Sequence, residues 1–217
     1  MANPLVAFTL IKRLHSELFC DYFTNDNPGL LLLPVRREVL SLQPYVVLYH
    51  NFITDTETED VKRIAQQGVS AGAVAWLKDS AHSIVGKLDQ RISMLTGLNV
   101  KHPYGEYLQV VNYGIGGHYE PHFDHATVNT TLKECPFPQL SSVEAGGSTA
   151  FIYANFSAPV VEKAAIFWWN LHRNGQGDVD TLHAGCPVLI GDKWVANKWI
   201  HEYGQEFQHR CSLNPEE

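Results

Sequence analysis

Residues 107–124 read YLQVVNYGIGGHYEPHFD. Two short aromatic or β-branched runs, Tyr107–Tyr113 and His118–Asp124, lie on either side of glycines in this stretch, and the pattern predicts two β-strands. Three runs of similar composition follow along the chain: Ser148–Tyr153, Ala164–Asn170 and Trp194–His201. Short strands at this spacing, separated by Gly, Pro and Asn, are typical of a β-sandwich or jelly roll.

The chain before Gly97 predicts helices instead. Thr54 with Glu57 three residues later forms a capping box, so we expect a helix from Thr54 to Gly68. A second helix is expected from near Ser80 to a stop at Gly97, because apolar residues recur every three or four positions. These residues are Ile84, Leu88, Ile92 and Leu95. Helices packed on the outside of the strands would support a site that the strands hold.

The first 45 residues form a predicted extension of helical and then irregular structure. Ala7–Phe19 has a helical composition, and the prolines at 28, 34 and 44 break any helix that follows. Tyr45–His50 is a short apolar, β-branched run that predicts a strand. We therefore expect an α+β chain in which residues 1–45 precede a single folded domain.

Composition and charge narrow the range of partners. The chain has 217 residues and a net charge of −7, from 16 Lys and Arg against 23 Asp and Glu. A nucleic-acid partner is not expected, because phosphate binding needs a basic face. No apolar run reaches the roughly 18–20 residues that cross a bilayer. Leu5–Ile11 is followed by positive charge instead of being preceded by it, so it predicts a helix and not a secretory leader.

His122 and Asp124 are candidate metal ligands. Residues i and i+2 project from the same face of a strand, so the imidazole and the carboxylate would converge. A third histidine from elsewhere, for which His183 is the candidate, would complete a 2-His-1-carboxylate triad. Such a triad leaves open positions for a bidentate 2-oxo acid and O₂. A histidine paired with a carboxylate in a surface network remains the alternative.

Lys193 is a candidate for binding a carboxylate. It precedes the aromatic run Trp194–Trp199, and a lysine that lines a sheet needs an acidic partner. The distal carboxylate of 2-oxoglutarate would serve as that partner. An exposed lysine in the turn after Gly191 and Asp192 is the alternative.

Three segments resemble the catalytic domain of the collagen prolyl 4-hydroxylase α subunits: Val111–Asp124, Ala164–Asn170 and Asp180–Phe207. A looser likeness extends back to Tyr45 and includes Leu95–Leu98. The resemblance implies a double-stranded β-helix (jelly roll) core with supporting N-terminal helices. It also implies a catalytic domain over residues 46–217, with the Fe(II)/2-oxoglutarate dioxygenase core at about 104–203.

The resemblance assigns roles to the candidate residues. His122, Asp124 and His183 match iron ligands, and Lys193 and Tyr113 match residues that bind 2-oxoglutarate. The expected enzyme is a procollagen-proline 4-dioxygenase that uses Fe(II), L-ascorbate, O₂ and 2-oxoglutarate, and releases succinate and CO₂. The family implies a collagen-like proline peptide as substrate, protein disulfide isomerase as a partner and the endoplasmic reticulum lumen as location.

Two aromatic residues and two cysteines are also matched. Tyr119 and Trp199 correspond to residues that line the proline site, with core aromatics as the alternative. Cys186 and Cys211 match a disulfide pair. The partners of the remaining cysteines, Cys20 and Cys135, are left open.

Departures from the family pattern support a second hypothesis, a degenerate homologue that binds or assembles without catalysis. The family's N-terminal dimerisation and peptide-binding repeats have no counterpart, and Gln67–Trp76 is shorter than the family's mobile lid. Between Asp124 and Gly146 no core strand is evident, and Pro136 and Pro138 argue against a central strand. We therefore expect a gap in the sheet beside the metal ligands.

Overall fold

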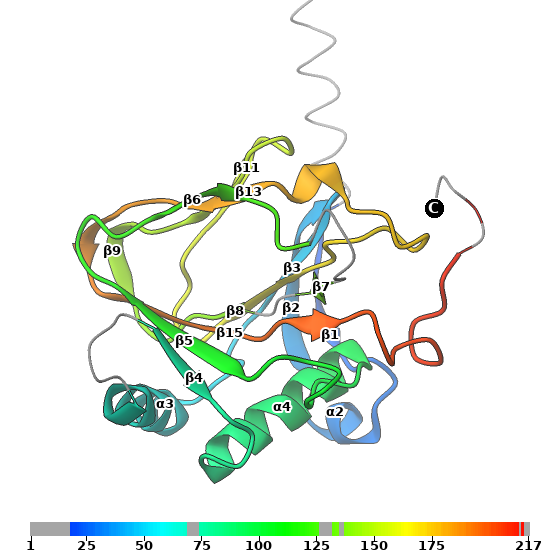
Figure 1. Cartoon of the computed structure of the whole chain (residues 1–217), viewed down its shortest axis with the longest axis horizontal. Coiled ribbons are helices and arrows are strands. Elements are labelled where there is room, and N and C mark those ends of the chain that lie inside the picture. The colour runs from blue at the N-terminus through cyan, green and yellow to red at the C-terminus, as the bar shows by residue number, and fades with distance from the viewer. Residues whose placement is uncertain (1–17, 69–73, 126–131, 135–136, 213, 215–217) are drawn as a thin grey trace, which may run out of the picture.

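The computed structural model describes residues 18–68, 74–125, 132–134, 137–212 and 214. Two layers of strands face each other. Helices cover the outer side of the larger layer, which is the lower one in Figure 1. The described α-helices are α2 (Pro28–Leu32), α3 (Asp55–Gly68) and α4 (Ser83–Thr96). The described part of the chain is therefore mostly β-sheet with few helices. No helix in the described part is long and apolar enough to span a membrane.

The larger layer consists of two antiparallel sheets side by side. The first has the order β1 (Cys20–Phe23), β2 (Val35–Leu42), β3 (Tyr45–Tyr49), β12 (Ala165–Trp168) and β8 (Phe137–Pro138). The second has the order β15 (Lys193–Asn197), β5 (Leu108–Tyr113) and β4 (Val74–Leu77). The smaller layer has the order β11 (Phe156–Ala158), β10 (Thr149–Phe151), β13 (His183–Gly185) and β6 (Tyr119–His122).

Two further strand pairs complete the fold. The paired strands are β9 (Val143–Gly146) with β14 (Val188–Gly191), and β7 (Leu132–Glu134) with β16 (Ile200–His201). Figure 1 shows that β9 lies at the end of the molecule where the two layers meet. The expected strands after Gly97 are thus present, although most are shorter than the sequence runs that predict them.

Alternating side chains of β12 reach two separate cores. Ala165 and Phe167 pack in the core that contains the residues of α4, whereas Ile166 and Trp168 pack in the core that contains Phe151 of the smaller layer. All four residues of β12 are buried, because both faces of the strand are covered. The second core joins β12 to the smaller layer, and its residue Trp168 also lines a cavity between the layers.

Both predicted helices are confirmed. The Thr54 N–H donates to Glu57 Oε2 at 3.0 Å and the Glu57 N–H donates to Thr54 Oγ1 at 3.3 Å, which is the expected capping box. The second helix starts at Ser83 instead of Ser80, because His82 Nδ1 accepts from the Ile84 N–H and caps the first turn. It ends as predicted at Gly97, which has a left-handed φ of 76°.

The prediction of helical and then irregular structure in the first 45 residues is wrong over Cys20–Phe23 and Val35–Leu42, whereas α2 between them is a short helix. There β1 and β2 form strands, and β2 pairs with β3 across the predicted boundary at residue 45. Pro34 lies between the end of α2 and the start of β2, and Pro44 follows the end of β2, so both prolines mark the ends of elements. The predicted helix over Ala7–Phe19 lies almost entirely outside the described residues.

The predicted gap beside the metal ligands is bridged. Gln139, next to the two-residue strand β8, forms a β-bridge with Val195 of β15 and donates its N–H to the Ala164 oxygen at 2.8 Å. The Leu140 N–H then donates to the Trp194 oxygen at 2.9 Å. One short segment therefore joins both halves of the larger layer. The shortened lid stretch lies partly outside the described residues.

Candidate metal centre and pocket

His122, Asp124 and His183 converge between the two layers. His122 ends β6 and His183 begins β13, and the two residues are direct partners across this ladder. His122 Nε2 lies 3.4 Å from Asp124 Oδ1, and His183 Nε2 lies 3.7 Å from Asp124 Oδ2. One ligand atom from each residue lies within 4.8 Å of the others. The sequence predicted that Asp124 lies on the same strand as His122. In the structure Asp124 follows the end of β6, so its side chain reaches the site from the bend after the strand.

Backbone carbonyls orient both imidazole rings. His122 Nδ1 lies 2.7 Å from the Glu120 oxygen, and His183 Nδ1 lies 2.9 Å from the Thr181 oxygen. A carbonyl can only accept, so each Nδ1 carries the proton and each Nε2 keeps its lone pair for a metal. Burial also lowers the pKa of His183, which favours the neutral ring that binds metals.

The carboxylate of Asp124 needs a cationic partner. Its Oδ2 atom is buried and has no hydrogen-bond partner within the described residues. A buried, unpaired carboxylate oxygen is costly, and a divalent cation between the three ligand atoms would satisfy it. Two neutral imidazoles and one carboxylate fit Fe(II) and leave coordination positions open on the cavity side.

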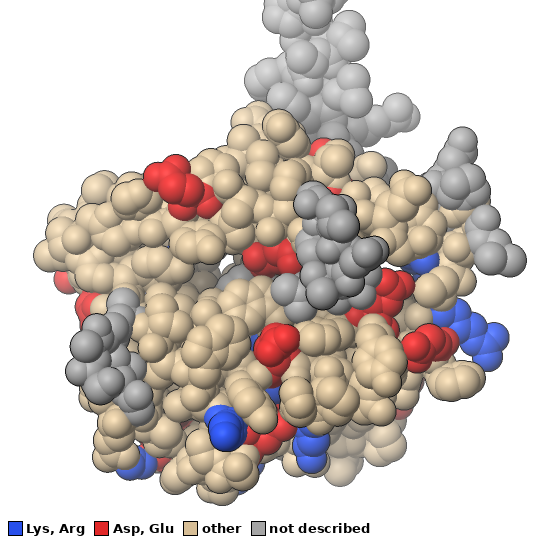
Figure 2. All heavy atoms as spheres, in the orientation of Figure 1, with Lys and Arg blue, Asp and Glu red and all other residues tan. Residues whose placement is uncertain are grey.

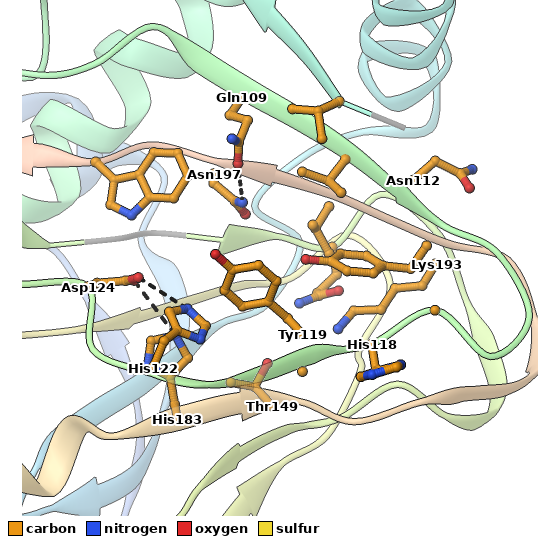
Figure 3. Close-up of a pocket in the computed structure, with 18 of the residues that line it drawn as sticks. Gln109, Asn112, His118, Tyr119, His122, Asp124, Thr149, His183, Lys193 and Asn197 are labelled. Atoms are coloured by element: carbon orange, nitrogen blue, oxygen red, sulfur yellow. Dashed lines mark hydrogen bonds and ion pairs between the residues drawn. The ribbon is translucent and has the colours of Figure 1, made fainter. Parts of the chain in front are cut away.

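A cavity of about 500 Å³ extends from these three residues between the layers. Figure 3 shows Lys193 and the three candidate ligands reaching into it from opposite strands. Lys193 is 5% exposed, so the alternative of an exposed turn lysine is wrong. It has no acidic partner in the described part of the chain, and burial lowers its pKa to about 8. A carboxylate ligand in the cavity would supply the missing partner.

The wall around Lys193 is a regular cross-strand array. Lys193 is the direct partner of Tyr113, and its Nζ lies 5.3 Å from the centre of the tyrosine ring. Alternate residues of β15 share one face, so Asn197 lines the same cavity, where its Nδ2 donates to Gln109 Oε1 at 2.9 Å. Strand alternation from Lys193 could have identified Asn197 in the sequence.

Two other lining residues, Gln139 and Thr149, were missed. Thr149 follows the glycine turn at the start of β10 and enters the cavity from the smaller layer. Gln139 reaches the cavity only because its segment lies beside β15. No sequence pattern indicates that neighbourhood.

The two aromatic candidates lie at the cavity. Tyr119 is 53% exposed, and its ring meets the His122 ring edge-on with centres 4.1 Å apart. Its exposure contradicts the alternative of a core aromatic. Trp199 lines the cavity and also packs against the core between the layers. Both residues therefore line the cavity that the candidate metal ligands also line.

The predicted disulfide between Cys186 and Cys211 is not formed, and both cysteines are free. The N–H of Cys186 donates to the Ser148 oxygen beside β10, which holds this residue on the smaller layer. Cys211 lies in the C-terminal segment, with its Sγ 3.7 Å from Glu202 Oε1. Cys20 is also free, and Cys135 lies outside the described residues.

The 2OG-Fe(II) oxygenase superfamily matches residues 108–201, which include all three candidate ligands and Lys193. Prolyl 4-hydroxylase subunit alpha-3 of Bos taurus is 56% identical over 93% of this chain and 42% of its own length. Prolyl 4-hydroxylase subunit alpha-1 of Homo sapiens is 38% identical over 94% of this chain and 43% of its own length. The chain thus spans less than half the length of these relatives.

Solved structures show the same fold. The viral collagen prolyl hydroxylase of Paramecium Bursaria Chlorella virus-1, in its 2OG complex, superposes with a TM-score of 0.62 at 24% identity, over 72% of this chain and 94% of that one. A Trichoplax adhaerens prolyl hydroxylase bound to a peptide fragment superposes with a TM-score of 0.55 at 14% identity, over 90% of this chain and 93% of that one. Residues 108–201 are therefore similar to the 2OG-Fe(II) oxygenase superfamily, and nearly the whole chain resembles part of the prolyl 4-hydroxylase α subunits.

Proposed function

We propose that this chain is a 2-oxoglutarate-dependent dioxygenase that hydroxylates peptidyl proline at C4, as the procollagen-proline 4-dioxygenases do. One observation carries the proposal: the candidate iron ligands and an unpaired buried lysine line the same cavity. The identity to the prolyl 4-hydroxylase subunits supports proline as the target. The Trichoplax adhaerens prolyl hydroxylase, which is in complex with a peptide fragment, supports a peptide as the form in which proline is presented.

His122, Asp124 and His183 would hold Fe(II). When bound there, the iron supplies the redox chemistry by which one atom of O₂ enters succinate, with release of CO₂, and the other enters the proline C4–H bond. Lys193 would hold the distal carboxylate of 2-oxoglutarate, and Tyr113 would pack over the lysine at the same end of the cavity. Tyr119 and Trp199 would contact the proline ring at the other end.

The acidic balance of the chain suits a neutral or basic peptide. Figure 2 shows Asp and Glu side chains around the middle of the face that is hollowed between the layers, and Lys and Arg mainly along its lower and right edges. An anionic substrate would meet repulsion on this face. A collagen-like peptide, whose prolines and glycines carry no charge, would not.

We also propose that the two facing layers form a double-stranded β-helix, with the dioxygenase core at about residues 104–203 in a catalytic domain over residues 46–217. Residues 20–42 add strands to the larger layer of that domain. L-ascorbate as reductant, protein disulfide isomerase as partner and residence in the endoplasmic reticulum lumen are carried over from the family resemblance.

The test is a coupled turnover assay. The protein is incubated with Fe(II), ascorbate, 2-oxoglutarate and a (Pro-Pro-Gly)-type peptide, and both succinate and hydroxyproline are measured. We expect equal amounts of the two products, and loss of both in His183→Ala. His172→Ala serves as the matched control, because His172 lies outside this cavity lining. Metal binding without peptide-dependent turnover would instead favour a non-catalytic homologue.

A further inference from the structure

Two lysines are buried in the described part of the chain, and their surroundings differ. Lys198 is fully buried, and its Nζ lies 2.8 Å from Asp89 Oδ1, so a carboxylate compensates its charge. Lys193 is also buried, but no acidic side chain of the described residues pairs with it. Its Nζ points into the cavity between the layers, as Figure 3 shows. Lys193 is therefore the buried lysine that a small molecule can reach.

The amine of Lys193 is neutral in a large fraction of the molecules near pH 8. Burial disfavours the charged form of a lysine, and it lowers the pKa of Lys193 to about 8. About half of the molecules then carry the neutral amine at pH 8, which is on the order of a hundred times the fraction for an exposed lysine with a pKa of about 10.4. A desolvated neutral lysine is a nucleophile.

The groups next to this amine leave it accessible. On β5, the ring centre of Tyr113 lies 5.3 Å from Lys193 Nζ, and burial raises the pKa of the phenol, which stays uncharged near pH 8. Cys186, which follows β13, raises the pKa of Lys193, but by less than burial lowers it. The other titratable side chains of the cavity lining are His118, Tyr119, His122, Asp124 and His183.

The cavity favours a small uncharged electrophile at this amine. Carbon dioxide enters without the desolvation cost of an ion. Its addition to an amine creates a carboxylate-like group at the end of the lysine, in the same part of the cavity where the site would receive a carboxylate ligand. The hydroxyl groups of Tyr113 and Thr149 line this cavity and can donate hydrogen bonds to such a group.

We propose that Lys193 is a site of reversible carbamate formation with CO₂. The lone pair of the neutral Nζ forms a bond to the carbon of CO₂, one C=O π pair moves onto oxygen, and Nζ releases one proton to water. Nothing is oxidised or reduced. The product is a carbamate anion at the position of the ammonium group. Dissolved CO₂ suffices for this step, so the inference does not depend on turnover.

Carbamate formation would reverse the charge at this end of the cavity. The distal carboxylate of 2-oxoglutarate would then meet an anion instead of an ammonium group, so CO₂ and 2-oxoglutarate should exclude each other. This consequence rests on the proposed function, in which the reaction itself releases CO₂ into the same cavity. Accumulated CO₂ would then slow the enzyme by competing with its co-substrate.

Chemical trapping tests the inference directly. The protein is equilibrated with ¹³C-labelled bicarbonate and treated with triethyloxonium, which converts a carbamate into a stable ethyl ester, and its peptides are mapped by mass spectrometry. We expect the labelled ester on Lys193, with the paired Lys198 and the exposed Lys87 as internal controls that remain unlabelled. At fixed dissolved CO₂, labelling should rise between pH 7 and 9, because the neutral amine becomes more abundant.

Mn(II) with 2-oxoglutarate should lower the labelling of Lys193 several-fold, because a bound carboxylate favours the ammonium form. In calorimetry at constant pH and ionic strength, CO₂ should weaken 2-oxoglutarate binding to the Mn(II)-loaded protein several-fold. Lys193→Arg has no neutral amine at this pH, so its affinity should not respond to CO₂.

Absence of the ester from Lys193, or equal labelling of Lys87, would overturn the inference. An equal response of Lys193→Arg to CO₂ would overturn the exclusion between CO₂ and 2-oxoglutarate. Labelling of Lys193 that 2-oxoglutarate does not lower would leave the carbamate site standing. That result would instead overturn the role of Lys193 in the proposed function.

Discussion

The two walls of the cavity are built differently. The wall with the candidate iron ligands consists of the short strands β6, β13 and β10, of four, three and three residues. The wall with Lys193 consists of β5 and β15, of six and five residues, and α3 and α4 cover its outer side in Figure 1. Among the described elements, no helix covers the outer side of the first wall.

The difference shows how each set of side chains is held in place. Behind Lys193, the opposite faces of β5 and β15 bury Leu108, Val110 and Ala196 in the core shared with α4. We call the wall with Lys193 the binding wall and the wall with the candidate iron ligands the metal wall. On the metal wall, local hydrogen bonds from Nδ1 to backbone carbonyls orient the two histidines. The wall with Lys193 is thus backed by the larger core, whereas the wall with the candidate iron ligands packs on the smaller core through Phe151 and would gain further support from a bound ion. The predictions below test this contrast.

The largest effect is expected from breaking the buried ion pair under the binding wall. Lys198→Met leaves Asp89 buried without its cation, and loss of one partner of such a pair costs about 3–5 kcal/mol. Burial already raises the pKa of Asp89 to about 6 with the lysine present. Urea denaturation should show this loss in the free energy of unfolding.

The control for this variant is Lys62→Met, which removes a surface pair with Glu59 at 3.4 Å and should cost less than about 1 kcal/mol. The double variant Lys198→Met/Asp89→Leu should recover most of the stability, because it removes both buried charges. A loss below about 1 kcal/mol for Lys198→Met would show that the binding wall does not depend on this network.

The next largest effect concerns the affinity for 2-oxoglutarate. Lys193→Met keeps the length of the side chain but removes its donors, and a hydrogen bond to a charged group contributes about 1.5–3 kcal/mol. We expect 2-oxoglutarate to bind about 10 to 150 times more weakly, with Mn(II) affinity unchanged. Calorimetry with the Mn(II)-loaded protein measures both. Parallel loss of metal binding would contradict the separation of the two walls.

Metal removal tests how far the metal wall depends on a bound ion. Chelation should increase amide hydrogen exchange in Tyr119–His122 and His183–Gly185 by about tenfold, because the ligands then lose their shared partner. In Leu108–Tyr113 and Lys193–Asn197 the change should stay below about twofold. Mass spectrometry of peptic peptides resolves the two regions. Equal changes in both would mean that the walls are one cooperative unit.

The sequence could predict those features that depend on local signals or on a family resemblance. The helices over residues 54–68 and 83–96 were evident because capping and apolar spacing are local signals. The histidine and lysine candidates were evident because long segments around them resemble a known family. Strands β1 and β2 were missed because only their pairing with β3 and with each other stabilises them.

Other features depend on contacts distant in sequence. The approach of Trp76 to Trp199, the burial of Lys198 against Asp89 and the bridging role of Gln139 all require neighbours from separate segments. The disulfide prediction came from the resemblance alone, and Cys186 and Cys211 are free in this structure. Local patterns identified the chemistry of the site but not the way its walls are held.

The smallest expected effect is a pH dependence of 2-oxoglutarate affinity, which arises from Lys193 on the binding wall. Lys193 has a pKa of about 8 without ligand, below its usual range, because it is buried. A bound carboxylate favours the ammonium form and raises that pKa. Affinity should therefore be complete well below pH 8 and decline as the pH rises through it, by about fivefold between pH 8 and 9. Calorimetry with the Mn(II)-loaded protein across this range measures the decline.

Lys193→Arg identifies the group responsible for this decline. An arginine stays protonated above pH 12, so its binding curve should be flat between pH 8 and 9, even if its affinity is lower. A metal ligand that titrated in the same range would impose the same slope on both proteins. A flat curve for the arginine variant would thus assign the proton to the binding wall, and an unchanged slope would assign it to the metal wall.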